Sequence, residues 1–409
     1  MFHCPENRLL LGCLAAKEDE EAVCKLQGIA SQEIDWAYIL RFSERNRLTQ
    51  LLYHNFLRFG IAEYMHPQIR QTFEKTYHSV GFHNALYYEE LRNLLRLFEQ
   101  AGMKTIVLKG AAITDAVFKN VALRQMDDID LLIQEQDIEG STTLLTEAGY
   151  VPDERRHTKE WYRIHHHHLA PFIHPDRGFI VEMHHHIIPP DNPFGIDIGP
   201  LWERAQVTKI GESRTLVLSS EDLIIHLCIQ LAYFGGFIPG LKNIIDIVQV
   251  LRYHGLGLDW DRIRKEASEH HYIGFIYYPL YLAKKLFDAN IEKDVLSAFK
   301  QCSKLDILEL SLLNLMTGNI LLKDDASSIL PKGYLSVVCR QLLHDAPARY
   351  KMRSLVKKFL HQDDSQMKGV PRSSLSENDR SAGVQRIARV FLKTFRHVAG
   401  VLSHKTETA

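Results

Sequence analysis

The chain has 409 residues, of which 45% are hydrophobic, and its 49 basic side chains nearly balance its 50 acidic ones. This length exceeds what one hydrophobic core usually organises, so we expect a globular protein of several domains. The near-neutral charge argues against electrostatic capture of nucleic acid, and we find no stretch that approaches the roughly 20 apolar residues of a membrane span.

The cysteines indicate the compartment. The six cysteines are scattered, without the short paired spacing of zinc ribbons or disulfide scaffolds. Residues 9–13 superficially match a lipoprotein cleavage box, but Glu6 and Asn7 precede only three leucines and there is no basic start. We therefore expect a cytoplasmic protein.

The first quarter of the chain has a helical pattern. Across residues 1–100 the apolar side chains recur at helical spacing, with few β-branched runs. A further amphipathic segment, 87–98, is followed by Gly102, which is typical of a helix stop. We expect an N-terminal helical region that ends before the first strand.

Residues 101–218 have a mixed pattern. We expect strands at 105–108 and 129–133, helices at 111–119 and 137–148, and strand-like segments at 161–173 and 178–187. The last two segments flank Pro175 and Gly178, which predict a turn and hence a β-hairpin. This alternation favours an α+β fold with a small mixed β-sheet.

The rest of the chain returns to helical spacing. Ser219 and the acidic residues after it predict a helix start, and a C-terminal helical domain follows over 219–361. Residues 362–385 have the composition of a flexible linker. Residues 386–409 predict a basic amphipathic helix; we favour a packed terminal helix, with peripheral contact to an anionic membrane or a protein as the alternative.

The chemistry concentrates on a pair of aspartates. Asp128 and Asp130 stand two residues apart at the start of the strand 129–133, so alternation places both carboxylates on one face and the apolar residues on the other. Close carboxylates repel one another unless a cation lies between them, and hard oxygen ligands suit Mg²⁺ or Mn²⁺. Glu182, isolated in an apolar strand segment, is the candidate third acid that nucleotidyl transfer often uses.

These residues carry a family resemblance. The order Lys-Gly, helix, Arg, Asp-x-Asp-Leu-Leu and a later apolar-Glu-apolar-His strand resembles the uncharacterised bacterial nucleotidyltransferase family within the DNA polymerase β-like superfamily. The resemblance covers residues 1–260 or so, and such proteins often serve as accessory enzymes of bacterial biosynthetic clusters. It implies a small mixed sheet with helices, metal-binding aspartates at Asp128 and Asp130, and a third acid at Glu182.

The residues at the candidate phosphate-binding loop differ from those of the wider superfamily, whose nucleotide loop usually begins with Gly-Ser. Here Lys109 and Gly110 occupy the corresponding place, as they do in the narrower family. Lysine serves phosphate as a point charge, and glycine lets the backbone come close. Arg124 is the candidate second cation for the phosphates, although Lys109 and Arg124 could instead be structural ion-pair partners of the acids.

Two histidine runs, at 165–168 and 184–186, suggest a rival zinc or nickel site. Consecutive side chains on a strand point alternately, so at most about half of each run could converge on one ion. We therefore favour separate roles for them at the active site and the surface. His184 and His186 share the face of Glu182 and are the candidates to assist the chemistry, for example as a base.

A further set of polar residues lies in the C-terminal helical part. His226, Lys242 and Asp246 could line a cleft against the catalytic sheet and touch the base or the acceptor, or could simply be exposed or capping residues.

Together these patterns predict a metal-dependent nucleotidyltransferase. It would pass a nucleoside monophosphate from an NTP to a hydroxyl or phosphate of a small-molecule or peptide acceptor, with release of pyrophosphate. Two other classes stay open at this point: a non-catalytic nucleotide- or metal-binding module that recruits a partner, and a His-dependent metallohydrolase.

Overall fold

The computed structural model describes residues 4–15, 19–190, 194–237, 240–255, 257–303, 305, 307–322, 338–340 and 342–344. The predicted linker at 362–385 and the predicted tail helix at 386–409 lie outside the described residues.

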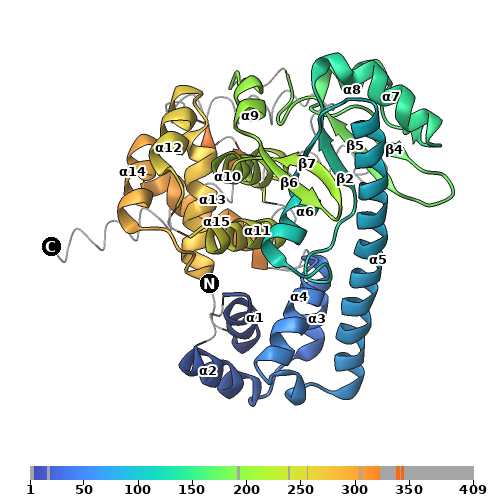
Figure 1. Ribbon diagram of the computed structural model, residues 1–409. Coiled ribbons are helices and arrows are strands. Elements are labelled where there is room, and N and C mark those ends of the chain that lie inside the picture. The colour runs from blue at the N-terminus through green and yellow to red at the C-terminus, as the bar shows by residue number, and fades with distance from the viewer. Residues whose placement is uncertain are drawn as a thin grey trace, which may run out of the picture.

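A seven-stranded mixed sheet forms the middle of the molecule (Figure 1). In chain order the strands are β1 (Ile106–Val107), β2 (Ile129–Leu132), β3 (Val151–Pro152), β4 (Phe172–Ile173), β5 (Ile180–His184), β6 (Gln206–Ile210) and β7 (Ser213–Val217). Their order across the sheet is β3-β4-β5-β2-β1-β7-β6. The pairs β2–β5 and β1–β7 are parallel and the others antiparallel, so the predicted α+β class with a mixed sheet is confirmed.

Helices precede, interrupt and follow this sheet. Before it lie α1 (Pro5–Ala15), α2 (Glu20–Ala30), α3 (Trp36–Arg45), α4 (Thr49–Arg58) and the long α5 (Pro67–Gln100). Between the strands lie α6 (Lys109–Ile113), a π-helical turn (Thr114–Phe118), α7 (Ile138–Glu147), α8 (Lys159–His165) and α9 (Gly199–Arg204). After it come α10 (Ser220–Ile229), α11 (Gly240–His254), α12 (Trp260–Glu269), α13 (Ile273–Phe287), α14 (Lys293–Ser303) and α15 (Ile307–Leu322).

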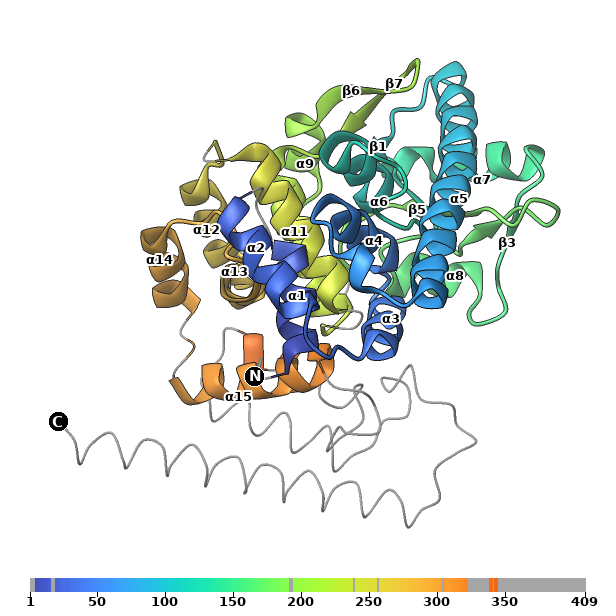
Figure 2. The ribbon, with the colours of Figure 1, turned by 90° about the horizontal axis from the view of Figure 1, so that it is seen from below.

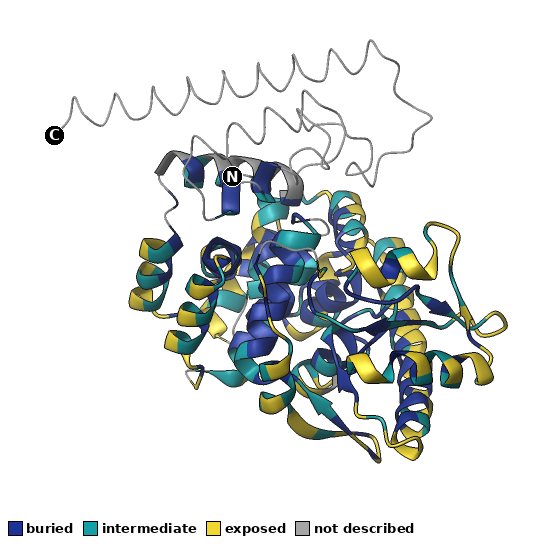
Figure 3. Cartoon of the chain, turned by 90° about the horizontal axis from the view of Figure 1, so that it is seen from above, coloured by how far each residue is buried: buried dark blue, intermediate teal, exposed yellow. Residues whose placement is uncertain are grey.

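One face of the sheet packs on α5 and α7. Ile129 and Leu131 of β2, together with Val181 and Met183 of β5, join a buried cluster with apolar residues of both helices. Figure 1 shows α5 running along this side, and Figure 3 shows its outer surface exposed. Because alternate residues of a strand face opposite ways, the residues between these four point to the opposite face.

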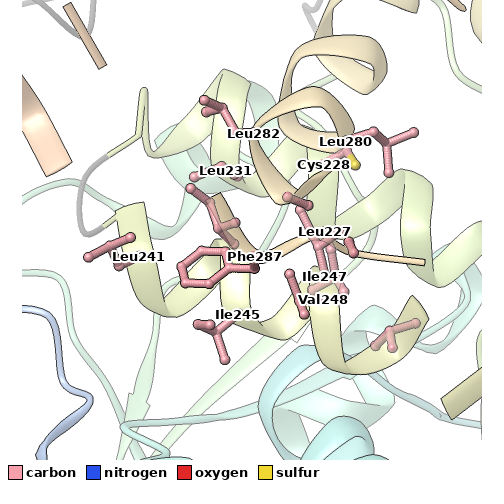
Figure 4. Close-up of a cluster of buried hydrophobic side chains, with 14 of the residues drawn as sticks. Leu227, Cys228, Leu231, Leu241, Ile245, Ile247, Val248, Leu280, Leu282 and Phe287 are labelled. Atoms are coloured by element: carbon pink, nitrogen blue, oxygen red, sulfur yellow. The ribbon is translucent and has the colours of Figure 1, made fainter. Parts of the chain in front are cut away.

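The opposite face lies toward the C-terminal helices. Ile106 of β1 and Leu132 of β2 belong to a second, larger core that includes α10, α11 and α13. Figure 4 shows buried side chains of α10, α11 and α13 packed together, with Ile245 and Val248 of α11 among them. The N-terminal helices enter the same core, since α1 packs on α13 (Figure 2).

Two local predictions were wrong in part. The segment 161–173 was expected to be strand-like, but α8 occupies its first part, and only β4 (Phe172–Ile173) is a strand. The Thr158 side chain accepts a hydrogen bond from the Trp161 backbone amide at 3.2 Å, so this cap sets the helix start. The helix expected over 111–119 begins earlier, at Lys109, and becomes a π-helical turn at Thr114.

The predicted hairpin is confirmed. Strands β4 and β5 pair antiparallel, with Phe172 opposite Val181, and Gly178 takes a φ of +71° in the connecting turn.

Among the helices of the described residues, none combines the length and apolar character needed to cross a bilayer.

Candidate active site

The acids predicted from the sequence meet in the middle of the sheet. Asp130 on β2 and Glu182 on β5 are direct neighbours in the parallel register. Their side chains share one face because paired residues of parallel strands point the same way. Ile129 and Leu131 lie in the core on the other face, which confirms the predicted alternation along β2.

Lys109 closes one side of this cluster. Its Nζ lies 2.9 Å from Asp130 Oδ1, and the Leu108 amide donates to the Asp130 carbonyl at 3.0 Å. Lys109 itself has a φ of +38°, which an L-residue adopts only when its surroundings enforce it. The turn between β1 and α6 is therefore built to hold this ammonium group against the acid.

His184 completes the buried cluster. It is 0% exposed, its Nε2 lies 2.8 Å from Asp130 Oδ1, and the same nitrogen lies 3.6 Å from Glu182 Oε2. One ligating atom each from Asp130, Glu182 and His184 falls within 4.8 Å of the others. The sequence therefore identified His184 correctly as a neighbour of the acids.

The buried charged groups of the site shift the pKa values of one another. The Asp130 carboxylate, with burial and Glu182, raises the pKa of Asp128 to about 7. Burial alone would raise the pKa of Asp130, but Lys109 and the hydrogen bond with His184 hold that pKa below its usual range. Burial and Lys109 act to lower the pKa of His184, yet its hydrogen bonds with the acids raise it.

Arg124 is not directed at these acids. Its Nε and Nη2 donate to the two carboxylate oxygens of Asp246 on α11 at 2.8 and 2.9 Å. Both side chains are buried, at 8% and 2% exposed. This bidentate pair joins the segment before β2 to the C-terminal helices, a geometry that favours a structural role over the phosphate contact expected from the sequence.

Gly110 has a packing role in the same place. A Cβ at this position would lie 2.7 Å from Arg124 Nη1. The absence of a side chain at Gly110 thus makes room for the guanidinium of Arg124, independently of any approach by a ligand.

Asn84 on α5 is a contributor that the sequence did not reveal. Its Nδ2 donates to the carbonyls of Val121 and Arg124, and its Oδ1 accepts from the Met126 amide. The side chain is 0% exposed. It shapes the segment that leads into Asp128, but its partners are backbone groups far along the chain, so no local pattern marks it.

Two predicted residues of the C-terminal helices approach the site. Burial and the neighbouring Arg124 lower the pKa of Lys242, on α11, to about 7, and Asp128 acts on it in the opposite direction. Burial, with Lys109 and His184 nearby, lowers the pKa of His226 to about 3. Neither ring nitrogen of His226 has a hydrogen-bond partner among the described residues.

The other predicted histidines divide into two groups. His186 follows the end of β5, and its ring nitrogens contact the Ile196 carbonyl at 2.8 Å and the Ile188 amide at 3.1 Å. Because β5 ends at His184, strand alternation does not fix the direction of His186, whose ring contacts are with the segment that follows the strand. The run at 165–168 lies at the end of α8, and His168 Nε2 reaches within 3.6 Å of Glu182 Oε2.

Carboxylates on adjacent strands beside a Lys-Gly turn are the arrangement that the sequence motifs predicted for a nucleotidyltransferase. Comparison with family models agrees: residues 32–288 match the family described as uncharacterised nucleotidyltransferase. Because this match spans more than half of the chain, the protein belongs to that family, as the sequence motifs predicted. Comparisons with curated proteins and with solved structures found no match.

Proposed function

We propose that the chain is a metal-dependent nucleotidyltransferase that moves a nucleoside monophosphate from an NTP to a hydroxyl or phosphate of a small-molecule or peptide acceptor. The observation that carries this proposal is the register of β2 and β5, which sets Asp130 beside Glu182 with Lys109 at 2.9 Å. Family membership supports the same class of reaction.

The acids fit a hard divalent cation such as Mg²⁺ or Mn²⁺. Asp128, Asp130 and Glu182 offer carboxylate oxygens, and the Asp130 carboxylate is the first cause of the raised pKa of Asp128, as is expected of carboxylates that repel one another. A bound cation would neutralise the triphosphate and align the attacking hydroxyl. Asp128, Asp130 and Glu182 are the residues that we propose as its ligands.

Lys109 and Lys242 are the cations proposed to face the phosphates. The Lys109 ammonium stands at the edge of the acid cluster, where a point charge can meet a phosphate oxygen. Lys242 lies on α11 within electrostatic reach of Asp128. Arg124, whose Nε and Nη2 already donate to the Asp246 carboxylate, would position α11 instead of binding phosphate.

His184 is proposed as a positioning residue. Its Nε2 lies 2.8 Å from Oδ1 of the Asp130 carboxylate, and an ionised carboxylate only accepts, so Nε2 carries a proton and donates it. A ring nitrogen engaged in this way fixes the orientation of the carboxylate and has no lone pair to offer the proton of the acceptor hydroxyl. This geometry supports orientation of Asp130 in place of the base role expected from the sequence.

The test is an assay of nucleotide transfer, in which the release of pyrophosphate and the mass of the product are measured. Each NTP, isotopically labelled, is incubated with Mg²⁺ or Mn²⁺ and with a cell extract as the source of acceptor. The native chain is compared with Asp130→Asn and with Asp176→Asn, a matched change in the exposed turn of the hairpin. We expect a labelled product from the native chain and the Asp176 variant, and none from the Asp130 variant.

The other outcomes separate the alternatives. NTP binding without any product that depends on Asp130 would refute transfer and favour a nucleotide-binding module. Hydrolysis that survives in Asp130→Asn but is lost in a variant of the histidines at 166–168 would favour a metallohydrolase. If no NTP binds at all, the proposed substrate class is wrong.

A further inference from the structure

Three consecutive histidines come together at the end of α8. The ring centroids of His166 and His167 are 4.4 Å apart, those of His166 and His168 are 4.0 Å apart, and those of His167 and His168 are 5.0 Å apart. One ring nitrogen from each lies within 4.8 Å of the others. This arrangement contradicts the expectation that neighbours in the run point alternately, which holds only on a strand.

The backbone explains why the three rings can converge. α8 ends at His165, the chain bends at His167, and His168 forms a single antiparallel bridge with His184 beside β5. The His185 amide donates to the His167 carbonyl at 3.1 Å, and the Leu169 amide donates to the Met183 carbonyl at 2.9 Å. The turn is thus fixed to β5 on both sides of His168.

The hydrogen bonding of His168 leaves a ligating nitrogen. Its Nδ1 lies 2.6 Å from the Leu169 carbonyl, and a carbonyl only accepts, so Nδ1 carries the proton. The lone pair therefore lies on Nε2, the atom that is 3.6 Å from Glu182 Oε2. A ring N–H bonded to a carbonyl is the usual companion of a metal bond at the other nitrogen.

The orphaned nitrogen of His167 points to the same conclusion. His167 is 5% exposed, and its Nδ1 is buried without a hydrogen-bond partner among the described residues. Burying a polar atom unpaired is unfavourable, so the position calls for a partner that the described part of the chain does not supply.

We propose that His166, His167 and His168 form a second metal site, which takes one borderline divalent ion of the Zn²⁺ class. Three imidazole nitrogens suit such an ion, whereas Mg²⁺ prefers oxygen ligands. Glu182 Oε2, which lies 3.6 Å from His168 Nε2, is the carboxylate oxygen that we propose to complete the set. The site joins the end of α8 to β5 next to the acids, and its existence does not depend on nucleotidyl transfer.

Zinc affinity tests the proposal directly. The untagged full chain, first stripped with a chelator, is titrated with Zn²⁺ in competition with a chromophoric chelator. His167→Ala/His168→Ala is compared with His165→Ala, which removes the exposed first histidine of the same run. Asp130→Asn is included to disable the acid cluster.

We expect one tightly bound Zn²⁺ per chain in the native protein, in His165→Ala and in Asp130→Asn. The double variant should bind at least about 100-fold more weakly, because loss of two direct ligands exceeds the effect of removing an outer partner. Native affinity in the double variant would overturn the proposal. Loss of zinc in Asp130→Asn would place the ion among the acids and overturn it too.

A measurement on the native chain alone covers the case in which the double variant does not fold. Co²⁺ bound by three imidazoles and a carboxylate in a tetrahedral site gives intense visible absorption, while octahedral oxygen ligation gives weak bands. We expect the intense bands, and we expect them to persist in excess Mg²⁺. Weak bands, or displacement by Mg²⁺, would assign the ion to the acid cluster and refute a histidine site.

Discussion

Removal of the Asp246 carboxylate should strongly destabilise the fold. In Asp246→Ala the guanidinium of Arg124 stays in place at 8% exposure but loses both charge-assisted hydrogen bonds, at 2.8 and 2.9 Å. Breaking a buried ion pair from one side costs about 3–5 kcal/mol, because the remaining charge is left uncompensated. For a chain of 409 residues that corresponds to a fall in melting temperature of about 3–6 °C.

The chain offers a matched control for this change. Arg155 contacts Asp153 with the same bidentate geometry, at 2.7 Å for both hydrogen bonds, but its side chain is 80% exposed. An exposed pair contributes at most about 1 kcal/mol, so Asp153→Ala should shift the melting temperature little. Thermal unfolding of the two variants and the native chain, followed by circular dichroism at one scan rate, measures the difference.

A double variant separates structure from phosphate binding. Arg124→Met/Asp246→Leu removes both charges together, and we expect it to recover most of the stability lost in Asp246→Ala. It should also retain NTP binding, measured by calorimetry. Equal shifts for Asp246→Ala and Asp153→Ala would refute the assignment of a buried structural pair. A stable double variant that no longer binds NTP would show that Arg124 is a phosphate ligand after all.

Three further predictions follow from the same contacts. Burial and Arg124 lower the pKa of Lys242 to about 7 from its ordinary 10.5. The free energy of unfolding of the native chain, relative to that of Lys242→Met, should therefore rise above pH 7 by up to about 1.4 kcal/mol per pH unit. Denaturant titrations at pH 6, 7.5 and 9 measure this difference. Gly274→Ala should unfold at a clearly lower temperature than the native chain, because its Cβ would lie 2.3 Å from the Leu343 carbonyl oxygen. Gly28→Ala, in α2 with open space around it, should instead raise the free energy of unfolding by about 0.5–1 kcal/mol. Because Asp130 raises the pKa of Asp128 to about 7, protons compete with the proposed cation, and calorimetry should find Mn²⁺ binding weaker at pH 6 than at pH 8; a pH-independent affinity would contradict this.

The sequence predicted those structural features that depend on residues close together in the chain. Alternation along 129–133 correctly placed Ile129 and Leu131 in the core with α5, because the strand itself dictates which face each residue takes. The turn residues between β4 and β5 identified the hairpin for the same reason, since Gly178 takes the positive φ that the turn requires.

The features that it did not predict depend on contacts between distant segments. Arg124 and Asp246 are 122 residues apart, and nothing near Arg124 distinguishes an arginine paired with a helix from one that meets a phosphate. Asn84 is equally invisible, because it binds backbone groups at positions 37 to 42 residues away. Side chains of this kind acquire their roles only when the C-terminal helices and α5 close over the sheet.

The two proposed metal sites differ in what holds their ligands together. The acids meet through the register of β2 and β5, so a slip of one residue would turn Asp130 or Glu182 to the wrong face. The three histidines are consecutive and converge through the turn after α8, which depends on the Thr158 cap and on the bridge between His168 and His184. On a strand, as predicted for this segment, at most about half of the run could converge; a helix end removes that restriction. The histidine site is therefore fixed by a local turn, the acid site by the sheet, and only Glu182 belongs to both.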